Sequence, residues 1–139
     1  MYCILDIETT GGQFNEEGIT EIAIYKFDGR EVVDQFISLV NPEIPIQPFV
    51  VKLTGINNAM LRSAPKFFEV AKRIIEITSD CIIVAHNASF DYRILRTEFK
   101  RLFSWLKDKK VTAIVTAELG DVFLTRMGLE ELIADCVIE

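Results

Sequence analysis

The 139-residue sequence contains a single histidine, no long apolar run and no closely spaced cysteine pair, and these shortages exclude whole classes of protein. The apolar run 81–85, as long as any in the chain, falls far short of the ~20 residues that a membrane-spanning helix needs. The start of the sequence shows no basic segment followed by an apolar one, which argues against secretion. We therefore expect a soluble, cytoplasmic protein with no membrane partner.

The cysteines and the charge narrow the choice further. Cys3, Cys81 and Cys136 lie in apolar stretches without a CxxC pair, so we expect reduced core thiols and no zinc site. No GxxxxGK[ST] motif occurs, so ATP is not expected to bind. The net charge of −6 argues against a general nucleic-acid coat and leaves only a local basic surface for phosphate contacts. The length fits one domain, and the oligomeric state is unknown from the sequence.

The first half of the chain predicts three consecutive antiparallel strands, over residues 1–7, 19–27 and 31–40. The dipeptide Asp28-Gly29 is typical of the hairpin turn between the second and third. Three of the four prolines fall in residues 41–48, which predicts an irregular connection, and short helical turns are expected to follow up to Asn58.

The second half alternates predicted helices and strands. Residues 63–65 are expected to form a helix entry, with Pro65 near the first turn of the helix, and a buried strand is expected over residues 81–86. Asn87 would cap a helix running to about Lys110, and the remaining predictions are a strand at 111–116, a helix at 129–134 and a strand at 136–138. Three antiparallel strands followed by this alternation predict an α/β fold with a mixed sheet and helices packed on it.

Asp6 and Glu8 form the most informative pair of residues in the sequence. If residues 1–7 form a strand, both side chains point to one face and lie about 7 Å apart. Two adjacent carboxylates on a half-buried strand repel each other and lose hydration, and a divalent cation removes both penalties. The alternative is an exposed strand end whose acids are solvated. Asp91 follows the strand 81–86 and would join the pair if that strand lay parallel to the first.

Three ordered motifs carry a family resemblance over residues 1–101. They are Asp6-x-Glu8-Thr9-Thr10-Gly11, Leu53-Thr54-Gly55-Ile56 and Asn87-x-x-Phe90-Asp91. With them the chain resembles the DEDD family of 3′–5′ exonucleases, which has the ribonuclease H-like fold and is typified by the proofreading epsilon subunit of bacterial DNA polymerase III.

The resemblance implies a two-metal mechanism at a single-stranded DNA 3′ end. Two Mg²⁺ or Mn²⁺ ions roughly 4 Å apart would generate the attacking hydroxide and stabilise the leaving oxygen. Asp6 would bridge both ions, and Glu8 and Asp91 would complete parts of their coordination. The residues implied in holding the terminal nucleotide are Thr9, Thr10, Gly11, Leu53, Thr54 and Phe90. For Leu53, Thr54 and Phe90 there is a simpler alternative to substrate packing. Leu53 and Phe90 could be core residues, and Thr54 could only shape a turn.

The sequence departs from the family pattern in its late part. The family places a histidine or a tyrosine before a fourth catalytic aspartate, yet no histidine follows His86 and no tyrosine follows Tyr92. His86 itself lies in the wrong place for the family's base, so we expect a structural role. The late aspartates Asp108, Asp121 and Asp135 stand in ordinary contexts. The three-carboxylate site is therefore predicted to be incomplete, with weak metal binding and weak or no hydrolysis.

Residues 102–116, Leu124-Thr125-Arg126 and residues 128–138 carry a second resemblance. In them the segment 102–139 resembles part of the circadian clock ATPase KaiC, which has a RecA-like P-loop domain. Two unrelated families meeting inside one helix predict an engineered chimera in a single hybrid domain, with a RecA-like helix-strand-helix-strand segment completing the sheet. A naturally diverged exonuclease is the alternative.

Two rival functions remain open. The first is a working 3′–5′ exonuclease of the DNA proofreading type that recruits an unexpected late acid. The second is a nucleic-acid or protein binding module without catalysis, in which the long helix offers a basic face. The residues of that face are Arg93, Arg96, Lys100, Arg101, Lys107, Lys109 and Lys110.

Overall fold

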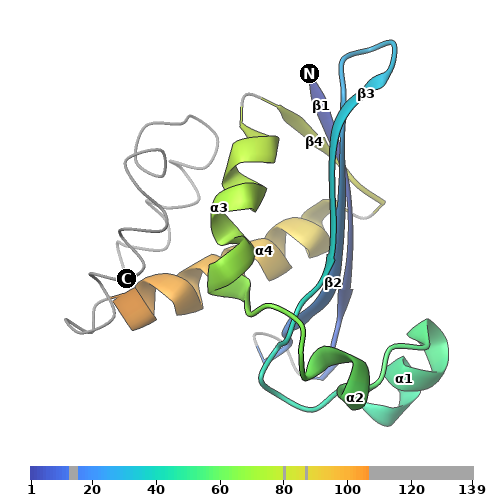
Figure 1. Cartoon of the computed structure of the whole chain (residues 1–139), viewed down its shortest axis with the longest axis vertical. Coiled ribbons are helices and arrows are strands. Elements are labelled where there is room, and N and C mark those ends of the chain that lie inside the picture. Colours follow the sequence, from blue (N-terminus) through green and yellow to red (C-terminus); the bar gives the residue numbers. More distant parts are fainter. Residues whose placement is uncertain (13–15, 80, 87, 107–139) are drawn as a thin grey trace.

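The structure, a computed structural model, describes residues 1–12, 16–79, 81–86 and 88–106 (Figure 1). Along the chain the elements are β1 (Tyr2–Thr9), β2 (Ile19–Phe27), β3 (Val32–Leu39), α1 (Pro48–Thr54), α2 (Asn58–Leu61), α3 (Phe67–Thr78), β4 (Ile82–Val84) and α4 (Ala88–Leu106). The elements predicted after residue 106, the cap at Asn87 and the three late aspartates lie outside the described residues.

The four strands form one mixed sheet in the order β3-β2-β1-β4. β1 pairs antiparallel with β2, and β2 pairs antiparallel with β3, whereas β4 runs parallel to β1. The predicted α/β fold, with three antiparallel strands followed by a parallel strand-helix unit, is confirmed. The segment expected to complete the sheet in a RecA-like manner falls beyond the part of the chain that can be described.

Strict alternation along β1 separates a core face from a polar face. Cys3, Leu5 and Ile7 are buried, whereas the intervening side chains of Asp6 and Glu8 lie on the opposite face. Helices α3 and α4 both cover the buried face of the sheet (Figure 1). Because the sequence period is two, the acid pair could not share the core face with these apolar neighbours.

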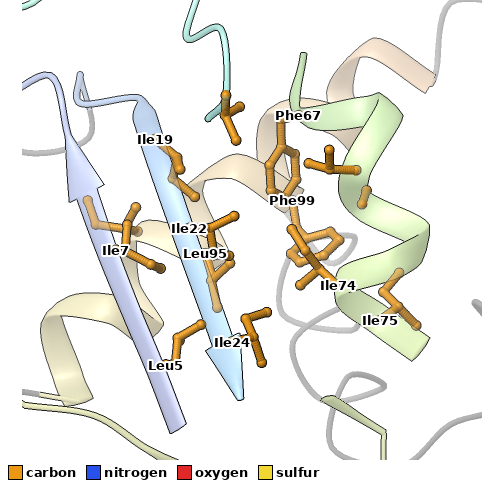
Figure 2. Close-up of a cluster of buried hydrophobic side chains, with 14 of the residues drawn as sticks. Leu5, Ile7, Ile19, Ile22, Ile24, Phe67, Ile74, Ile75, Leu95 and Phe99 are labelled. Carbon is orange, nitrogen blue, oxygen red and sulfur yellow. The ribbon is translucent and has the colours of Figure 1, made fainter. Parts of the chain in front are cut away.

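A single large cluster of apolar side chains joins the sheet to the two long helices (Figure 2). Ile22 and Ile24 of β2 are fully buried, as is Ile74 of α3. The rings of Phe67 and Phe99 meet edge to face with centroids 5.0 Å apart, and this contact joins α3 to α4. The core therefore fixes where the first turn of α4 lies relative to β1.

One sequence prediction is wrong in its bounds and in its burial. The strand expected over residues 81–86 is only Ile82–Val84, and its three side chains are exposed instead of buried. The reason is position, because β4 is the edge strand of the sheet in the described part of the chain. Pro65 lies just before α3, near its first turn as expected, since Lys66 is the N-cap and its N–H bonds to Glu69.

Other predictions concern cysteine and the membrane. Cys3 and Cys81 are both unpaired thiols, as expected, with Cys3 buried and Cys81 partly exposed. Among the helices described, none is both long and apolar enough to cross a bilayer.

Candidate active site

The acid pair lies where β1 continues past its neighbour β4. Ile4 is the last β1 residue that pairs with β4, opposite Val84, so Asp6 and Glu8 extend beyond the end of that strand. On the other side, β1 remains paired with β2, and Glu8 stands directly opposite Glu21. Asp6 is exposed and Glu8 is half-buried. The predicted common face of the two carboxylates is therefore present.

Asp91 arrives at this place from the first turn of α4. Its side chain is only 3% exposed. Backbone N–H groups of Ile7 and of Asp91 itself donate hydrogen bonds to the carboxylate, and both act to lower its pKa. Because Ile7 stands between Asp6 and Glu8, the bond from Ile7 ties Asp91 to the acid pair. Asp91 is thus brought to the same end of the sheet as Asp6 and Glu8, and its charge acts on Glu8.

Mutual repulsion and burial raise the pKa values of two of these acids. The pKa of Glu8 is raised first by loss of hydration and then by the charges of Asp6, Glu21 and Asp91. The pKa of Asp91 is raised by loss of hydration and by Asp6, against smaller opposing contributions that include His86. The three charged side chains that raise the pKa of Glu8 are all acidic, so the site concentrates negative charge around Glu8.

The three carboxylates have the right chemistry to bind a divalent cation, but their observed spacing is too wide. Carboxylate oxygens are the ligands that Mg²⁺ and Mn²⁺ prefer, and a cation would offset the repulsion among the acids. In the described ranges, however, no group of three or more histidine, cysteine, aspartate or glutamate side chains stands close enough to hold a metal ion as placed. Asp6, Glu8 and Asp91 would therefore have to move closer together to coordinate one ion.

The segment after Glu8 begins the turn from β1 to β2 and is held by its own hydroxyl groups. The Thr9 hydroxyl donates to Oε2 of Glu17 at 2.7 Å and accepts the N–H of Gly11 at 3.3 Å. The Thr10 hydroxyl accepts the N–H of Gly18 at 3.1 Å. Both threonines are buried, so their hydroxyls serve the turn itself. Their predicted contact with a nucleotide stays a prediction.

Helix α1 packs directly against this turn. The N–H of Gln47 donates to the Thr10 carbonyl at 2.9 Å. Gly11 has φ +69°, and a Cβ at this position would lie 2.7 Å from Cγ2 of Val50 and 3.1 Å from Cζ of Phe49. Only glycine allows the helix to approach so closely. The motif glycine therefore positions α1 beside the acid pair.

The remaining predicted substrate residues differ in their exposure. Leu53 is 80% exposed on α1, so it is not a core residue, whereas the Thr54 hydroxyl donates to the Val50 carbonyl at 2.9 Å. Phe90 is partly buried against the core, and the Arg93 guanidinium lies 5.2 Å from its ring centroid. His86 is exposed, and it acts on the pKa of Asp91 through its charge. Their roles toward a substrate remain predictions.

With this geometry in place, comparison with known proteins is informative. Residues 3–129 match the family described as Exonuclease (RNase_T). The chain belongs to this exonuclease family. The match continues past residue 101, where we expected the exonuclease resemblance to end, and so includes most of the segment predicted to resemble KaiC.

Relatives of known function support the assignment. This exonuclease domain is 40% identical over 119 residues to the DNA polymerase III PolC-type of Bacillus subtilis, covering 86% of the chain and 8% of that protein. It is 36% identical over 110 residues to the 3′–5′ exonuclease DinG of Staphylococcus aureus strain USA300, and this match covers 79% of the chain and 12% of that protein. The chain therefore spans about a tenth of the length of these relatives. The 119-residue match is too long to lie within residues 1–101 alone.

Solved structures show the same fold. Exonuclease X in complex with 5′ overhanging duplex DNA superposes with a TM-score of 0.55 at 35% identity, covering 68% of this chain and 53% of that one. Exonuclease I superposes with a TM-score of 0.65 at 23% identity, covering 72% of this chain and 24% of that one. One structure of exonuclease I holds single-stranded DNA and a zinc ion. The ribonuclease H-like arrangement predicted from the motifs is thus confirmed.

Two features of this exonuclease domain escaped the sequence analysis. Glu17 is 8% exposed and binds both Thr9 and Arg93, yet in the sequence it belongs to a polar stretch that resembles a solvated loop. Phe49 is 63% exposed beside Gly11, and nothing in its sequence spacing separates it from a core residue. Only the fold, which returns residues 47–50 to the turn after β1, reveals either position.

Proposed function

We propose that these 139 residues form a divalent-metal-dependent 3′–5′ exonuclease domain that engages the 3′ end of single-stranded DNA and, alone, hydrolyses it weakly. The observation that carries the proposal is the convergence of Asp6, Glu8 and Asp91 at the end of β1, where burial and repulsion raise the pKa values of the latter two. Mg²⁺ or Mn²⁺ is the expected cofactor, because the donors are carboxylates.

The protein's own groups would divide the work as follows. Asp6, Glu8 and Asp91 would hold the cation, and a bound cation would supply Lewis-acid stabilisation to the phosphate. The exposed side chain of Leu53 and the half-buried Thr54 lie on α1, whose residues Phe49 and Val50 approach Gly11, and a terminal nucleotide would lie against this helix. Weak hydrolysis is expected because no histidine follows His86 and no tyrosine follows Tyr92 in these residues, and the lack of a general base costs typically 10²–10⁴-fold.

Calorimetry with MnCl₂ and a 3′-end assay together test this proposal. The wild-type chain should bind Mn²⁺, Asp6→Asn should not, and release of mononucleotides from a 5′-labelled single-stranded oligonucleotide should be slow. Absence of Mn²⁺ binding would remove the metal centre. Multiple turnovers per second, abolished by Asp6→Asn, would instead establish the rival of a fully working exonuclease.

The binding-module rival has less support from the side chains of α4. Two members of its predicted basic face are engaged in ion pairs: Arg93 lies 3.3 Å from Glu17, and Arg101 lies 3.0 Å from Glu98. Salt-dependent DNA binding that survives Asp6→Asn would favour this rival.

The engineered-chimera hypothesis also remains a proposal. It rests on the resemblance of residues 102–139 to KaiC, and α4 does cross the junction at residue 102 as a continuous helix. The exonuclease match up to residue 129 counts against it over the shared segment. Natural divergence of one exonuclease domain accounts for that match more simply.

A further inference from the structure

Glu17 is a buried carboxylate whose two oxygens bind two different elements of the site. Oε2 accepts the Thr9 hydroxyl at 2.7 Å, and Oε1 lies 3.3 Å from Nη2 of Arg93. The residue is 8% exposed. Its backbone carbonyl additionally accepts Nη1 of Arg101 at 2.8 Å, which fixes the main chain of Glu17 against α4.

The partners of Glu17 are next to the metal-site acids in the chain. Thr9 directly follows Glu8 at the end of β1, and Arg93 lies two residues after Asp91 in α4. The Glu17 side chain therefore bridges the two segments that deliver acids from different elements. A shift of either segment would change the separation between Glu8 and Asp91.

We propose that Glu17 is the positioning residue of the metal centre, holding the end of β1 beside the first turns of α4, so that the carboxylates of the two segments face the same cation when it binds. This inference rests on the proposed function and deepens it. Glu17 does not touch the cation. It acts through the Thr9 hydroxyl and the Arg93 guanidinium.

The stability of the fold alone does not account for this arrangement. A buried carboxylate loses hydration, and a buried ion pair contributes little net stability compared with apolar groups of similar volume. The apolar cluster already joins β1 to α4 through residues such as Ile7 and Leu95 (Figure 2). The ion pair with Arg93 fixes the orientation of α4 relative to β1, because hydrogen bonds are directional and apolar contacts are not.

Arg93 extends the same influence to the predicted substrate side. Its guanidinium carbon lies 5.2 Å from the centroid of the Phe90 ring, in the first turn of α4 next to Asp91. Glu17 thereby acts on Asp91 through a residue that also touches Phe90. Partners of this kind, one step removed from a metal, typically change metal affinity by about 10–100-fold when they are mutated.

The test measures Mn²⁺ affinity by calorimetry on the full chain, together with melting temperature in EDTA. Glu17→Gln keeps the volume and removes the charge, and we expect the Mn²⁺ Kd to rise about 10-fold. The matched control is Glu98→Gln, another buried acid, which is 3.0 Å from Arg101 and accepts the Ile19 N–H. Its side chain has no bond to Thr9 or Arg93 among the described contacts and shares only Arg101 with the Glu17 carbonyl. Glu98→Gln therefore controls for loosening of α4, and the Kd should stay within about twofold of wild type.

A double variant separates positioning from general loosening. Glu17→Gln combined with Arg93→Gln should raise the Kd no further than the stronger single variant, because the two residues act as one unit. If Glu17→Gln does not fold, Thr9→Val tests the same bridge by removing one hydroxyl, and it should also weaken Mn²⁺ binding.

The possible failures are distinguishable. Wild type that binds Mn²⁺ with the same Kd as Glu17→Gln would overturn the positioning role and leave the metal centre intact. An equal loss of affinity in Glu98→Gln would also overturn it, since the cause would then be a looser α4. Wild type that binds no Mn²⁺ would overturn the proposed function itself.

Discussion

The acids near the end of β1 favour metal binding but destabilise the metal-free fold. Glu8 and Asp91 are held where burial and neighbouring acids disfavour their charged forms, so folding works against their ionisation. A bound cation would offset both the lost hydration and the repulsion between the acids. The acids most useful for binding metal are therefore the acids that weaken the metal-free fold.

Asp91→Asn should expose this opposition directly. Asparagine keeps an oxygen that can accept the Ile7 N–H but carries no charge, so in EDTA at neutral pH we expect the melting temperature to rise by a few degrees. Added Mn²⁺ should stabilise wild type and leave Asp91→Asn unchanged. Asp34→Asn, which loses an exposed ion pair with Arg73, is the control and should not gain stability in EDTA. A variant less stable than wild type in EDTA would contradict the argument.

The thiols offer a second test at the same scale. Burial, followed by the neighbouring Cys81, raises the pKa of Cys3 to about 12. The thiolate is the reactive form, so Cys3 should resist iodoacetamide at pH 8 in the folded protein, whereas the partly exposed Cys81 should be labelled first. Peptide mass spectrometry would assign the labelled sites, with labelling in denaturant as the reference. Equal labelling of both thiols in the native protein would show that β1 opens readily.

Among the elements, α1 depends most on one glycine. Gly11 and Gly55 have nearly the same backbone angle, φ +69° and +76°, but only a Cβ at Gly11 would meet another residue, at 2.7 Å. Gly55→Ala should cost about 1–2 kcal/mol of unfolding free energy from backbone strain. Gly11→Ala should cost about 1–3 kcal/mol more, because Val50 must also move.

Chemical denaturation of both variants would measure this difference, since their similar φ angles cancel the strain that they share. The same free energy of unfolding for the two would mean that α1 yields without cost. A larger loss at Gly11 would confirm that the glycine of the first motif serves the approach of α1 as well as the turn.

An element can be predicted from the sequence when the signals that define it lie within its own segment. The bounds of β2 were predicted at Ile19–Phe27 because alternation and a turn signal both lie within the segment. The burial of β4 was wrong, because an apolar run does not reveal which strand occupies a sheet edge. Glu17 could not be found at all, since its role depends on contacts with Arg93, 76 residues away.

The candidate site shows the same division. Asp6 and Glu8 were predictable as neighbours because strand geometry alone puts them on one face. The approach of Asp91 required the parallel pairing of β4 with β1, which the sequence left as a condition and the sheet shows. The internal use of the Thr9 and Thr10 hydroxyls was not foreseen, because their partners Glu17 and Gly18 follow a turn whose path the sequence does not specify.

At the scale of the whole molecule, the acids divide into two groups with opposite effects on stability. Glu8, Asp91 and Glu98 have raised pKa values, with loss of hydration as the largest cause in each. Asp28 and Asp34 have lowered pKa values, from backbone hydrogen bonds in the first case and from Arg73 in the second. The net charge of −6 means that the protein as a whole also repels further ionisation.

These directions predict an acidic optimum of stability for the metal-free protein. A raised folded-state pKa gives stability that is fully present below the unfolded pKa, 4.5 for glutamate and 3.8 for aspartate, and is lost as the pH rises through the folded value. A lowered one gives stability that is present above 3.8 and is lost as the pH falls. In EDTA the melting temperature should therefore peak at mildly acidic pH and decline toward neutrality.

Saturating Mn²⁺ should reverse the decline on the neutral side, because the cation binds the ionised acids of the folded state alone. Glu98→Gln should flatten part of the EDTA decline without changing the response to Mn²⁺, since Glu98 lies in the Arg101 contact and not among the three converging acids. Melting curves across the pH range, with and without Mn²⁺, would measure both effects. A metal-free optimum at or above neutral pH would contradict the raised pKa values and, with them, the electrostatic reason for a cation at the end of β1.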